Sequence, residues 1–227
     1  MTLQATRADS ALRRGETLRI SEIFHSLQGE STRAGLPTVF IRLTGCPLRC
    51  TWCDTAYAFS GGEVMAIAAM LERVATFACP TVCVTGGEPL AQANCLNLLT
   101  ALCDAGYSVS LETSGSLDIS GVDQRVARIV DLKAPDSDES ARNRWENLDL
   151  LRPGDEIKFV LASRADYDWA VEASRQRRLF ERCPVLFSPV WDTLPPQQLA
   201  EWIVEDRLPV RFQLQLHKVL WGTTRGK

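Results

Sequence analysis

The sequence contains no long hydrophobic segment, few histidines and no marked excess of charge of either sign. Its 227 residues include two histidines and three methionines, and the formal net charge is −3. No run of about 18 apolar residues is present, so we expect no membrane-spanning helix. The sequence pI of about 5.5 argues against a general affinity for nucleic acid or for an anionic membrane surface.

The N-terminus lacks an apolar core of signal-peptide length, although it carries Arg7, Arg13 and Arg14. We therefore expect a cytoplasmic protein rather than a secreted one. Hydrophobic residues make up 45% of the chain and charged residues 23%, as is usual for a globular protein. No internal repeat or long linker divides the sequence. We predict a flexible tail over residues 1–18 and a single domain over residues 19–227.

Short β-rich segments alternate along the chain with segments of helical periodicity. Helical periodicity extends over residues 64–78, 98–105 and 195–206, and a weaker helical pattern extends over residues 167–179. This alternation is typical of βα units with parallel strands. The expected strands lie at residues 19–26, 38–44, 81–86, 108–113, 128–132, 156–161, 184–188 and 210–217.

Several of these strands have one apolar face and one polar face. In the strand at residues 38–44, Ile41 and Leu43 point one way, while Arg42 and Thr44 point the other. A sheet buried on both faces would instead consist of continuous apolar runs. We therefore expect an α/β fold, a modified and incomplete (β/α) barrel with a polar lumen. In barrels of this kind the active site lies at the carboxyl ends of the strands.

Three of the eight cysteines lie within eight residues, on a loop that follows the strand at residues 38–44. One compact loop can bring the thiolates of Cys46, Cys50 and Cys53 to a single inorganic centre. Three protein ligands would leave one position of a four-iron cluster open. The alternative is a structural zinc site, which needs a fourth ligand, and no other cysteine or histidine has a paired spacing. The other five cysteines suit packed positions in strands and helices.

The pattern C-x3-C-x2-C, with Trp52 before the last cysteine, resembles the radical S-adenosylmethionine (SAM) superfamily. The resemblance implies a [4Fe–4S] cluster on Cys46, Cys50 and Cys53 whose open iron binds SAM. It assigns no catalytic residue beyond the radical derived from the cofactor. The run from Thr85 to Pro89 resembles the superfamily's Gly-Gly-Glu-Pro motif, in which backbone carbonyls can approach the methionine ammonium. The implied SAM contacts are Trp52, Asp54, Gly86, Gly87, Glu88, Glu112, Ser114, Asp131, Lys133 and Ser188.

Within the superfamily, the segments at residues 23–30, 40–46, 53–55 and 215–222 resemble the 7-carboxy-7-deazaguanine synthase family. The resemblance extends over residues 19–222. It implies a lyase of queuosine biosynthesis, which converts 6-carboxy-5,6,7,8-tetrahydropterin to 7-carboxy-7-deazaguanine with loss of ammonia. It also implies that SAM is regenerated rather than consumed.

A carboxylated pterin suits a polar lumen. Arg42 could form a bidentate pair with the carboxylate, while Gln28 and Glu30 could bind the pterin N–H groups. The resemblance implies that Mg2+ binds to the hydroxyl of Thr55 beside the substrate carboxylate. The implied substrate contacts are Leu27, Gln28, Gly29, Glu30, Arg42, Thr85, Gly87 and His217.

Structural alternatives exist for some of these residues. Arg42 could belong to a buried ion pair, Thr55 could cap a helix, and His217 could cap a strand end. Ser31 stands where a glycine is frequent in the family.

The resemblance further implies a homodimer and an electron donor such as flavodoxin or ferredoxin. Two other functions remain open from the sequence. One is a radical SAM activase, which would place a glycyl radical on a partner enzyme. The other is a zinc-binding interaction module, which the content of iron and sulfide against zinc would distinguish.

Overall fold

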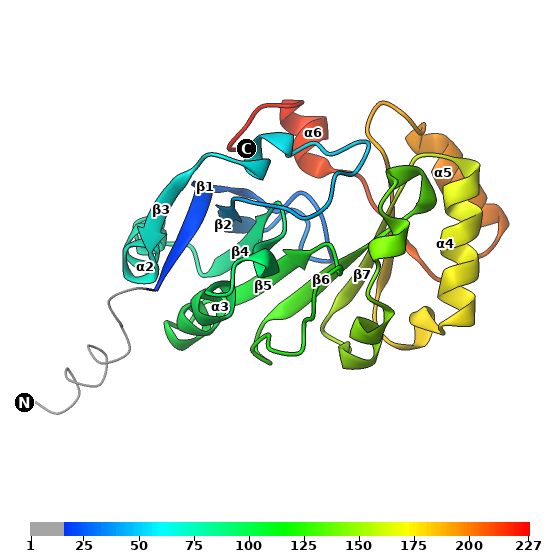
Figure 1. The fold of residues 1–227 in the computed structure, drawn as a ribbon. Helices are drawn as coiled ribbons and strands as arrows, with labels where there is room; N and C mark the ends of the chain where they lie inside the picture. The colour runs from blue at the N-terminus through cyan, green and yellow to red at the C-terminus, as the bar shows by residue number, and fades with distance from the viewer. Residues whose placement is uncertain (1–15) are drawn as a thin grey trace, which may run out of the picture.

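The computed structural model describes residues 16–227, which form one curved, open sheet with helices on its outer side (Figure 1). The nine strands follow the order β3-β1-β2-β4-β5-β6-β7-β8-β9. The pairs from β2 to β9 are all parallel. β1 pairs antiparallel with both β2 and β3. The predicted incomplete (β/α) barrel is thus confirmed. The structure further shows that the N-terminal strand β1 and strand β3 form an antiparallel edge of the sheet.

The strands are β1 (Thr17–Leu27), β2 (Pro37–Leu43), β3 (Glu63–Ala66), β4 (Thr81–Gly86), β5 (Ser108–Thr113), β6 (Ala127–Lys133), β7 (Glu156–Leu161), β8 (Val185–Pro189) and β9 (Arg211–Phe212). The α-helices are α2 (Ile67–Ala75), α3 (Cys95–Asp104), α4 (Arg164–Gln176), α5 (Pro196–Glu205) and α6 (Leu216–Trp221). Two short 3-10 turns beside the site are η1 (Ala56–Phe59) and η2 (Pro89–Ala91). No helix among residues 16–227 has the length and apolarity needed to cross a membrane.

The hydrophobic core lies between the apolar face of the sheet and the outer helices. Ile41 of β2 and Val84 of β4 are fully buried, as are Leu98 and Leu102 of α3. Burying an aliphatic side chain of this size stabilises the fold by about 1.5–3 kcal/mol. Gly106, with a φ of +88°, follows the end of α3, as its sequence position predicts.

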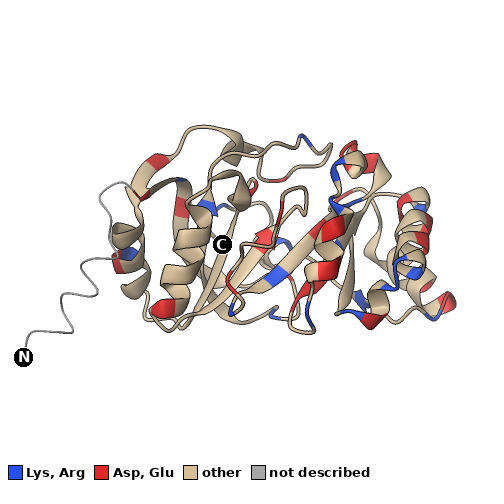
Figure 2. Ribbon diagram, turned by 60° about the horizontal axis from the view of Figure 1, so that its bottom comes forward, with Lys and Arg blue, Asp and Glu red and all other residues tan. Residues whose placement is uncertain are grey.

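Charged residues of both signs are interspersed along the ribbon (Figure 2). This distribution agrees with the small net charge of the chain. The polar strand faces turn away from the helices, and their charged side chains line the site described below.

The prediction of a strand over residues 210–217 is wrong beyond Phe212. β9 has only two residues, and His217 lies on α6. The chain leaves the sheet because it bonds to the loop that follows β1. The Gln213 side chain donates to the Ser31 carbonyl at 2.9 Å, and the Leu216 amide donates to the Gly29 carbonyl at 2.9 Å. His217 therefore reaches the site from a helix rather than from a strand face.

Several other element boundaries also differ from prediction. The helix expected from residue 64 begins at Ile67, because residues 63–66 pair with β1 as β3. The helix expected from residue 167 begins at Arg164, where the Ser163 hydroxyl accepts from the Asp166 amide. β1 begins at Thr17 and Leu18 is 1% exposed, so the predicted tail ends too late. The rest of that tail, residues 1–15, lies outside the described residues.

Candidate active site

A cavity of about 660 Å3 occupies the polar side of the sheet, at the carboxyl ends of the strands. Consecutive parallel strands supply Arg42, Thr85, Glu112, Asp131 and Lys158 to its wall. These residues lie on the strand faces opposite the core, as the two-residue period requires. The cysteine loop, α6 and the C-terminal residues 222–227 complete the lining.

Cys46, Cys50 and Cys53 line this cavity as free, half-buried thiols, whereas the other five cysteines are buried. Burial raises the pKa of Cys50 to about 11, against the opposing charge of Lys133. Within residues 16–227, no three His, Cys, Asp or Glu side chains are arranged to hold a single metal ion. A tetrahedral zinc site is therefore not formed there. A cubane cluster differs from zinc because it binds each thiolate on a separate iron, so three half-buried thiols on one loop fit it.

The cysteine loop is held by the turn that follows β4. The Gly87 amide donates to the Leu43 carbonyl at 3.2 Å, and the Glu88 amide donates to the Gly45 carbonyl at 2.8 Å. A Cβ atom on Gly87 would lie 2.8 Å from the Cβ of Cys46 and would clash with the Gly45 carbonyl. The glycines of this motif therefore let two loops pack directly on each other.

Glu88 lies behind the cavity wall, although the sequence predicted a SAM contact for it. Its side chain is fully buried. The carboxylate accepts from the Thr113 hydroxyl at 2.9 Å, the Ser114 amide at 2.7 Å and the Leu90 amide at 3.0 Å. Both oxygens are therefore occupied in joining the β4 turn to the end of β5. The structure does not bring this side chain to the cavity.

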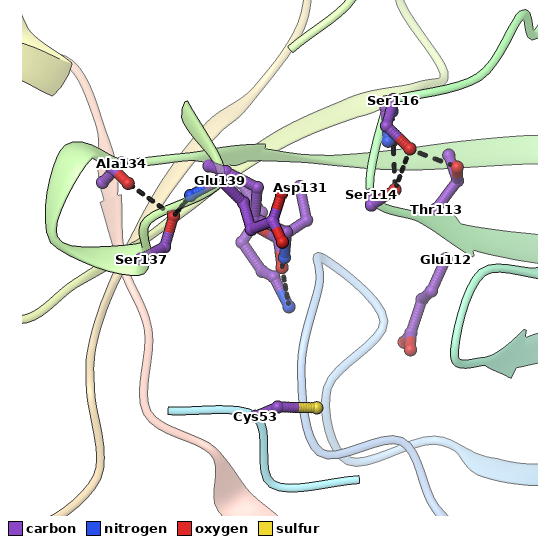
Figure 3. Close-up of polar contacts among 12 residues, drawn as sticks. Cys53, Glu112, Thr113, Ser114, Ser116, Asp131, Ala134, Ser137 and Glu139 are labelled. Carbon is purple, nitrogen blue, oxygen red and sulfur yellow. Dashed lines mark hydrogen bonds and ion pairs between the residues drawn. The ribbon is translucent and has the colours of Figure 1, made fainter. Parts of the chain in front are cut away.

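Glu112 extends from β5 toward the side of the cavity where Cys53 lies (Figure 3). The Thr85 hydroxyl donates to one carboxylate oxygen at 2.8 Å, and the side-chain Nε2 of Gln28 donates to the other at 3.1 Å. The side-chain Oε1 of Gln28 also accepts from the Glu30 backbone amide at 3.2 Å. These bonds connect strands β4 and β5 with the loop after β1.

Two lysines and two carboxylates form an ion-pair network on the cavity wall. Lys158 Nζ lies 2.5 Å from Glu30 Oε2 and 3.5 Å from Asp131 Oδ2. Lys133 Nζ lies 3.1 Å from the same Asp131 oxygen. Burial lowers the pKa of Lys158, but attraction to Glu30 and Asp131 outweighs it and holds the pKa well above its ordinary value. Asp131 Oδ1 is buried and has no partner within the described chain.

Arg42 is part of an ion pair and also lines the cavity. Its Nε donates to Glu22 at 2.7 Å, and the Tyr57 hydroxyl donates to the same oxygen at 2.8 Å. The guanidinium lies 6.0 Å from the centroids of both the Phe24 and Tyr57 rings. The predicted alternative of a structural ion pair is therefore present. It involves only Nε and holds the rest of the guanidinium against the cavity.

The Gln28-Gly29-Glu30 loop packs against α6. A Cβ atom on Gly29 would lie 2.9 Å from Cγ of His217 and would clash with its Nδ1. Burial lowers the pKa of His217. Ser31 has a φ of +68°, a left-handed conformation that glycine adopts at lower cost, which explains why glycine suits this position. The Ser31 hydroxyl stabilises the turn by accepting from the Arg33 amide at 3.0 Å.

Thr55 begins the short turn η1, but its side chain makes no capping hydrogen bond. The predicted alternative of a cap is therefore absent, and the residue lines the cavity. Asp54 is paired with Lys218 of α6 at 2.8 Å. Trp52, Leu27, Gly86, Gly87 and Ser114 also line the cavity, as predicted.

Ser188 is the second predicted site residue that does not line the cavity. It is 1% exposed within β8, and its hydroxyl has no partner among residues 16–227. Its neighbours after the strand, Val190 and Trp191, line the cavity instead.

Sequence reasoning missed several lining residues. Lys158 occupies the polar face of β7, and the same alternation that singled out Arg42 could have found it. Tyr57, Gln215 and Lys218 lie on loops and α6, where no periodic signal marks them. Arg225 lies 3.9 Å from the centroid of the Tyr57 ring, a contact that only the fold brings together.

Comparisons with known proteins agree with this geometry. Residues 40–176 match the radical SAM superfamily. The chain is 48% identical over 208 residues to the 7-carboxy-7-deazaguanine synthase of Chlorobaculum tepidum, covering 90% of this chain and 94% of that protein. It is 44% identical over 221 residues to the synthase of Koribacter versatilis, covering 90% and 97%. The crystal structure of QueE from Escherichia coli has the same fold, with a TM-score of 0.75, 22% identity, and coverage of 96% and 100%.

The chain belongs to the radical SAM superfamily, as the match to more than half of its residues shows. A [4Fe–4S] cluster and SAM are the cofactors of that class, and the three half-buried thiols fit such a cluster. Within the superfamily, the chain belongs to the 7-carboxy-7-deazaguanine synthases. The family resemblance predicted from the sequence is confirmed, and the zinc-binding module is excluded as its function.

Proposed function

We propose that this enzyme converts 6-carboxy-5,6,7,8-tetrahydropterin to 7-carboxy-7-deazaguanine with loss of ammonia, in queuosine and 7-deazapurine biosynthesis. One observation carries the proposal. A single cavity is lined both by the three free cysteines and by a separate group of charged and polar side chains suited to a carboxylated pterin. The related synthases carry the same product in their names.

Cys46, Cys50 and Cys53 would hold the [4Fe–4S] cluster. When bound, the reduced cluster and SAM supply a 5′-deoxyadenosyl radical that takes a hydrogen atom from the substrate and later returns it. The SAM molecule would lie along the carboxyl ends of β4 to β6. There the exposed backbone of Gly86 and Gly87 and the carboxylates of Glu112 and Asp131 offer acceptors for its ammonium and ribose hydroxyls.

The substrate would lie on the side of the cavity formed by β1, β2 and α6. Arg42 presents the free edge of its guanidinium, which can pair with the pterin carboxylate. Burial raises the pKa of Glu30, but the charge of Lys158, hydrogen bonds from Lys158 and Gln215, and the charge of His217 together outweigh burial and hold Glu30 as a carboxylate. An ionised Glu30 can accept from the amino and ring N–H groups of the pterin. Gln28 and His217 complete the polar contacts around the ring.

Thr55 would bind Mg2+ beside the substrate carboxylate. Its hydroxyl is not used by the turn that it begins, and it lies in the same cavity as Arg42. Magnesium retains several waters and takes few protein ligands, so one hydroxyl together with the substrate is a sufficient site. The ion would offset carboxylate charge and orient the substrate toward the cofactor.

The structure also favours this enzyme over a radical SAM activase. α6 and the C-terminal residues 222–227 contribute to the cavity wall, and Arg225 lies 3.9 Å from the centroid of the Tyr57 ring. A cavity lined in this way suits a small substrate, whereas an activase needs an open face for a protein partner. We further propose a cytoplasmic homodimer that receives electrons from flavodoxin or ferredoxin, as the family resemblance implies.

The test is turnover by the anaerobically reconstituted holoenzyme. Supplied with dithionite, SAM, Mg2+ and the carboxypterin, it should form 7-carboxy-7-deazaguanine, detected by mass and ultraviolet absorbance. A protein that carries a full cluster and cleaves SAM but yields no deazaguanine would contradict the proposal.

A further inference from the structure

Lys158 joins the two halves of the cavity. It lies on β7, directly opposite Asp131 of β6 in the register of the parallel strands. Its ammonium contacts Asp131, at 3.5 Å, on the proposed cofactor side. It also contacts Glu30, at 2.5 Å, on the proposed substrate side, 128 residues away in sequence.

The ion pair between Lys158 and Glu30 is largely buried. The side chain of Lys158 is 12% exposed, as is that of Glu30. A buried charge needs a partner, because removing one member of a pair leaves the other desolvated and uncompensated. The two carboxylates differ in this respect. Asp131 has a second cation, Lys133, at 3.1 Å, whereas within residues 16–227 the only other hydrogen-bond donor to the Glu30 carboxylate is the neutral side-chain amide of Gln215, at 2.7 Å.

We propose that Lys158 is a positioning residue that fixes Glu30, in its ionised form, as the acceptor for the N–H edge of the pterin. The proposal deepens the function proposed above and rests on it. The ion-pair partners of Lys158 among residues 16–227 are the carboxylates of Glu30 and Asp131, so we assign it a role through Glu30 rather than on the reacting atoms. Because Asp131 keeps Lys133, loss of Lys158 should weaken substrate binding far more than SAM binding.

The first test compares Michaelis constants in reconstituted Lys158→Met and wild-type enzymes. The KM for the carboxypterin should rise at least about tenfold, the cost of a lost charged hydrogen bond, while the KM for SAM stays within about threefold. Lys158→Arg, which keeps the charge, should recover part of the loss. Equal KM values for the pterin in variant and wild type, or equal increases for both ligands, would overturn the proposal.

A matched control removes a buried cation elsewhere. Arg128 pairs with Asp155 at 2.5 Å, with side chains 5% and 1% exposed, outside the cavity lining. Arg128→Met should lower the melting temperature without changing the ratio of the two KM values. A general loss of packing would therefore be distinguished from a loss of substrate recognition.

The second test uses pH. Two charged or titratable groups face Glu30 directly, Lys158 on β7 and His217 on α6. Asp131 of β6 lies beyond Lys158. Glu112 of β5 is connected to Glu30 through the side chain of Gln28. Without Lys158 the pKa of Glu30 should rise, so the carboxylate would be protonated on mild acidification. The pterin KM of Lys158→Met should therefore increase more steeply than that of the wild type between about pH 8 and pH 5.5. Because His217 and Glu30 influence each other's pKa, the same comparison in a Glu30→Gln background, where only His217 titrates, separates the two groups.

The third test keeps the proposal testable if Lys158→Met folds poorly. In a Glu30→Gln background, Lys158→Gln should raise the pterin KM by less than about twofold, because its partner is already neutral. The same large increase in both backgrounds would contradict the role assigned to Lys158. Absence of turnover by the wild type would refute the proposed function instead, so the two failures are distinguishable.

Discussion

The two walls of the cavity are built in different ways. The wall beside the cysteines consists of two loops in direct backbone contact, with the Glu88 amide bonded to the Gly45 carbonyl at 2.8 Å. The opposite wall consists of side chains joined by charge, with Lys158 paired to Glu30 at 2.5 Å. The wall beside the cysteines can form because its glycines have no side chain, whereas the opposite wall is held by the charges of its side chains. Changes of volume should therefore damage the cofactor wall, and changes of charge or pH the substrate wall.

The largest expected effect comes from the cysteine loop itself. Cys50→Ala should abolish cluster assembly, because the remaining two thiolates cannot hold a cubane that needs three protein ligands. Iron and sulfide per chain, and the brown absorbance after anaerobic reconstitution, measure the result. Cys103→Ala is the control, because Cys103 is buried in α3 outside the cavity, and it should retain the full iron content. Normal iron content in Cys50→Ala would remove this residue from the cluster site.

Adding one methyl group at Gly87 should test whether the wall beside the cysteines requires close backbone packing. Gly87→Ala would place a Cβ against the Gly45 carbonyl and 2.8 Å from the Cβ of Cys46. We expect destabilisation of about 1–3 kcal/mol and reduced cluster loading, because the loops must separate. Gly154→Ala is the matched control, because no atom lies within 4 Å of a Cβ there. Equal melting temperatures for the two variants would show that close loop packing is not required.

A change of charge should affect the other wall selectively. Arg42→Ala should weaken pterin binding roughly 10- to 100-fold through loss of a charge-assisted pair. Cleavage of SAM without product formation should persist, because Arg42 lies on the substrate side. Arg125→Ala, which removes a surface cation paired with Asp104 and Asp123, should change neither activity. Unchanged pterin affinity and turnover in Arg42→Ala would place the substrate carboxylate elsewhere.

The smallest expected effect is the contribution of His217 to the pH dependence of folding stability. Burial lowers the pKa of His217 in the folded enzyme below its value of about 6.5 in the unfolded chain. The unfolded state then binds more protons below about pH 6.5, so folding stability falls on acidification. The fall in melting temperature between pH 7.5 and pH 6 should therefore be smaller in His217→Gln than in the wild type. A steeper loss in the variant would contradict this sign.

The difference between the walls also explains how much the sequence could predict. The strands β4, β5 and β7 were predicted to the residue, because alternation and turn residues mark them locally. The three cysteines were found because their ligand spacing lies within one loop. Arg42 and Glu112 were placed in the lumen by the two-residue period alone. These features are local properties of a strand or a loop.

The features that could not be predicted depend on distant contacts. The expected strand at residues 210–217 fails because Leu216 bonds to Gly29, which precedes it by nearly the whole chain. Glu88 belongs to the Gly-Gly-Glu-Pro motif. Its carboxylate is nevertheless turned away from the cavity, because it bonds to Thr113 and Ser114 at the end of β5. Lys158 acquires its role from Glu30, a residue in another βα unit. Tertiary contacts, which periodicity does not encode, decide these positions.

The most direct measurement is electron paramagnetic resonance of the reduced, reconstituted enzyme before and after addition of SAM. Because Cys46, Cys50 and Cys53 supply only three thiolates to the cavity, one iron of a bound cluster would have no protein ligand and would be open to SAM. We therefore expect a [4Fe–4S] signal whose g values change when SAM binds. A signal that SAM leaves unchanged, or no cluster signal at all, would contradict it.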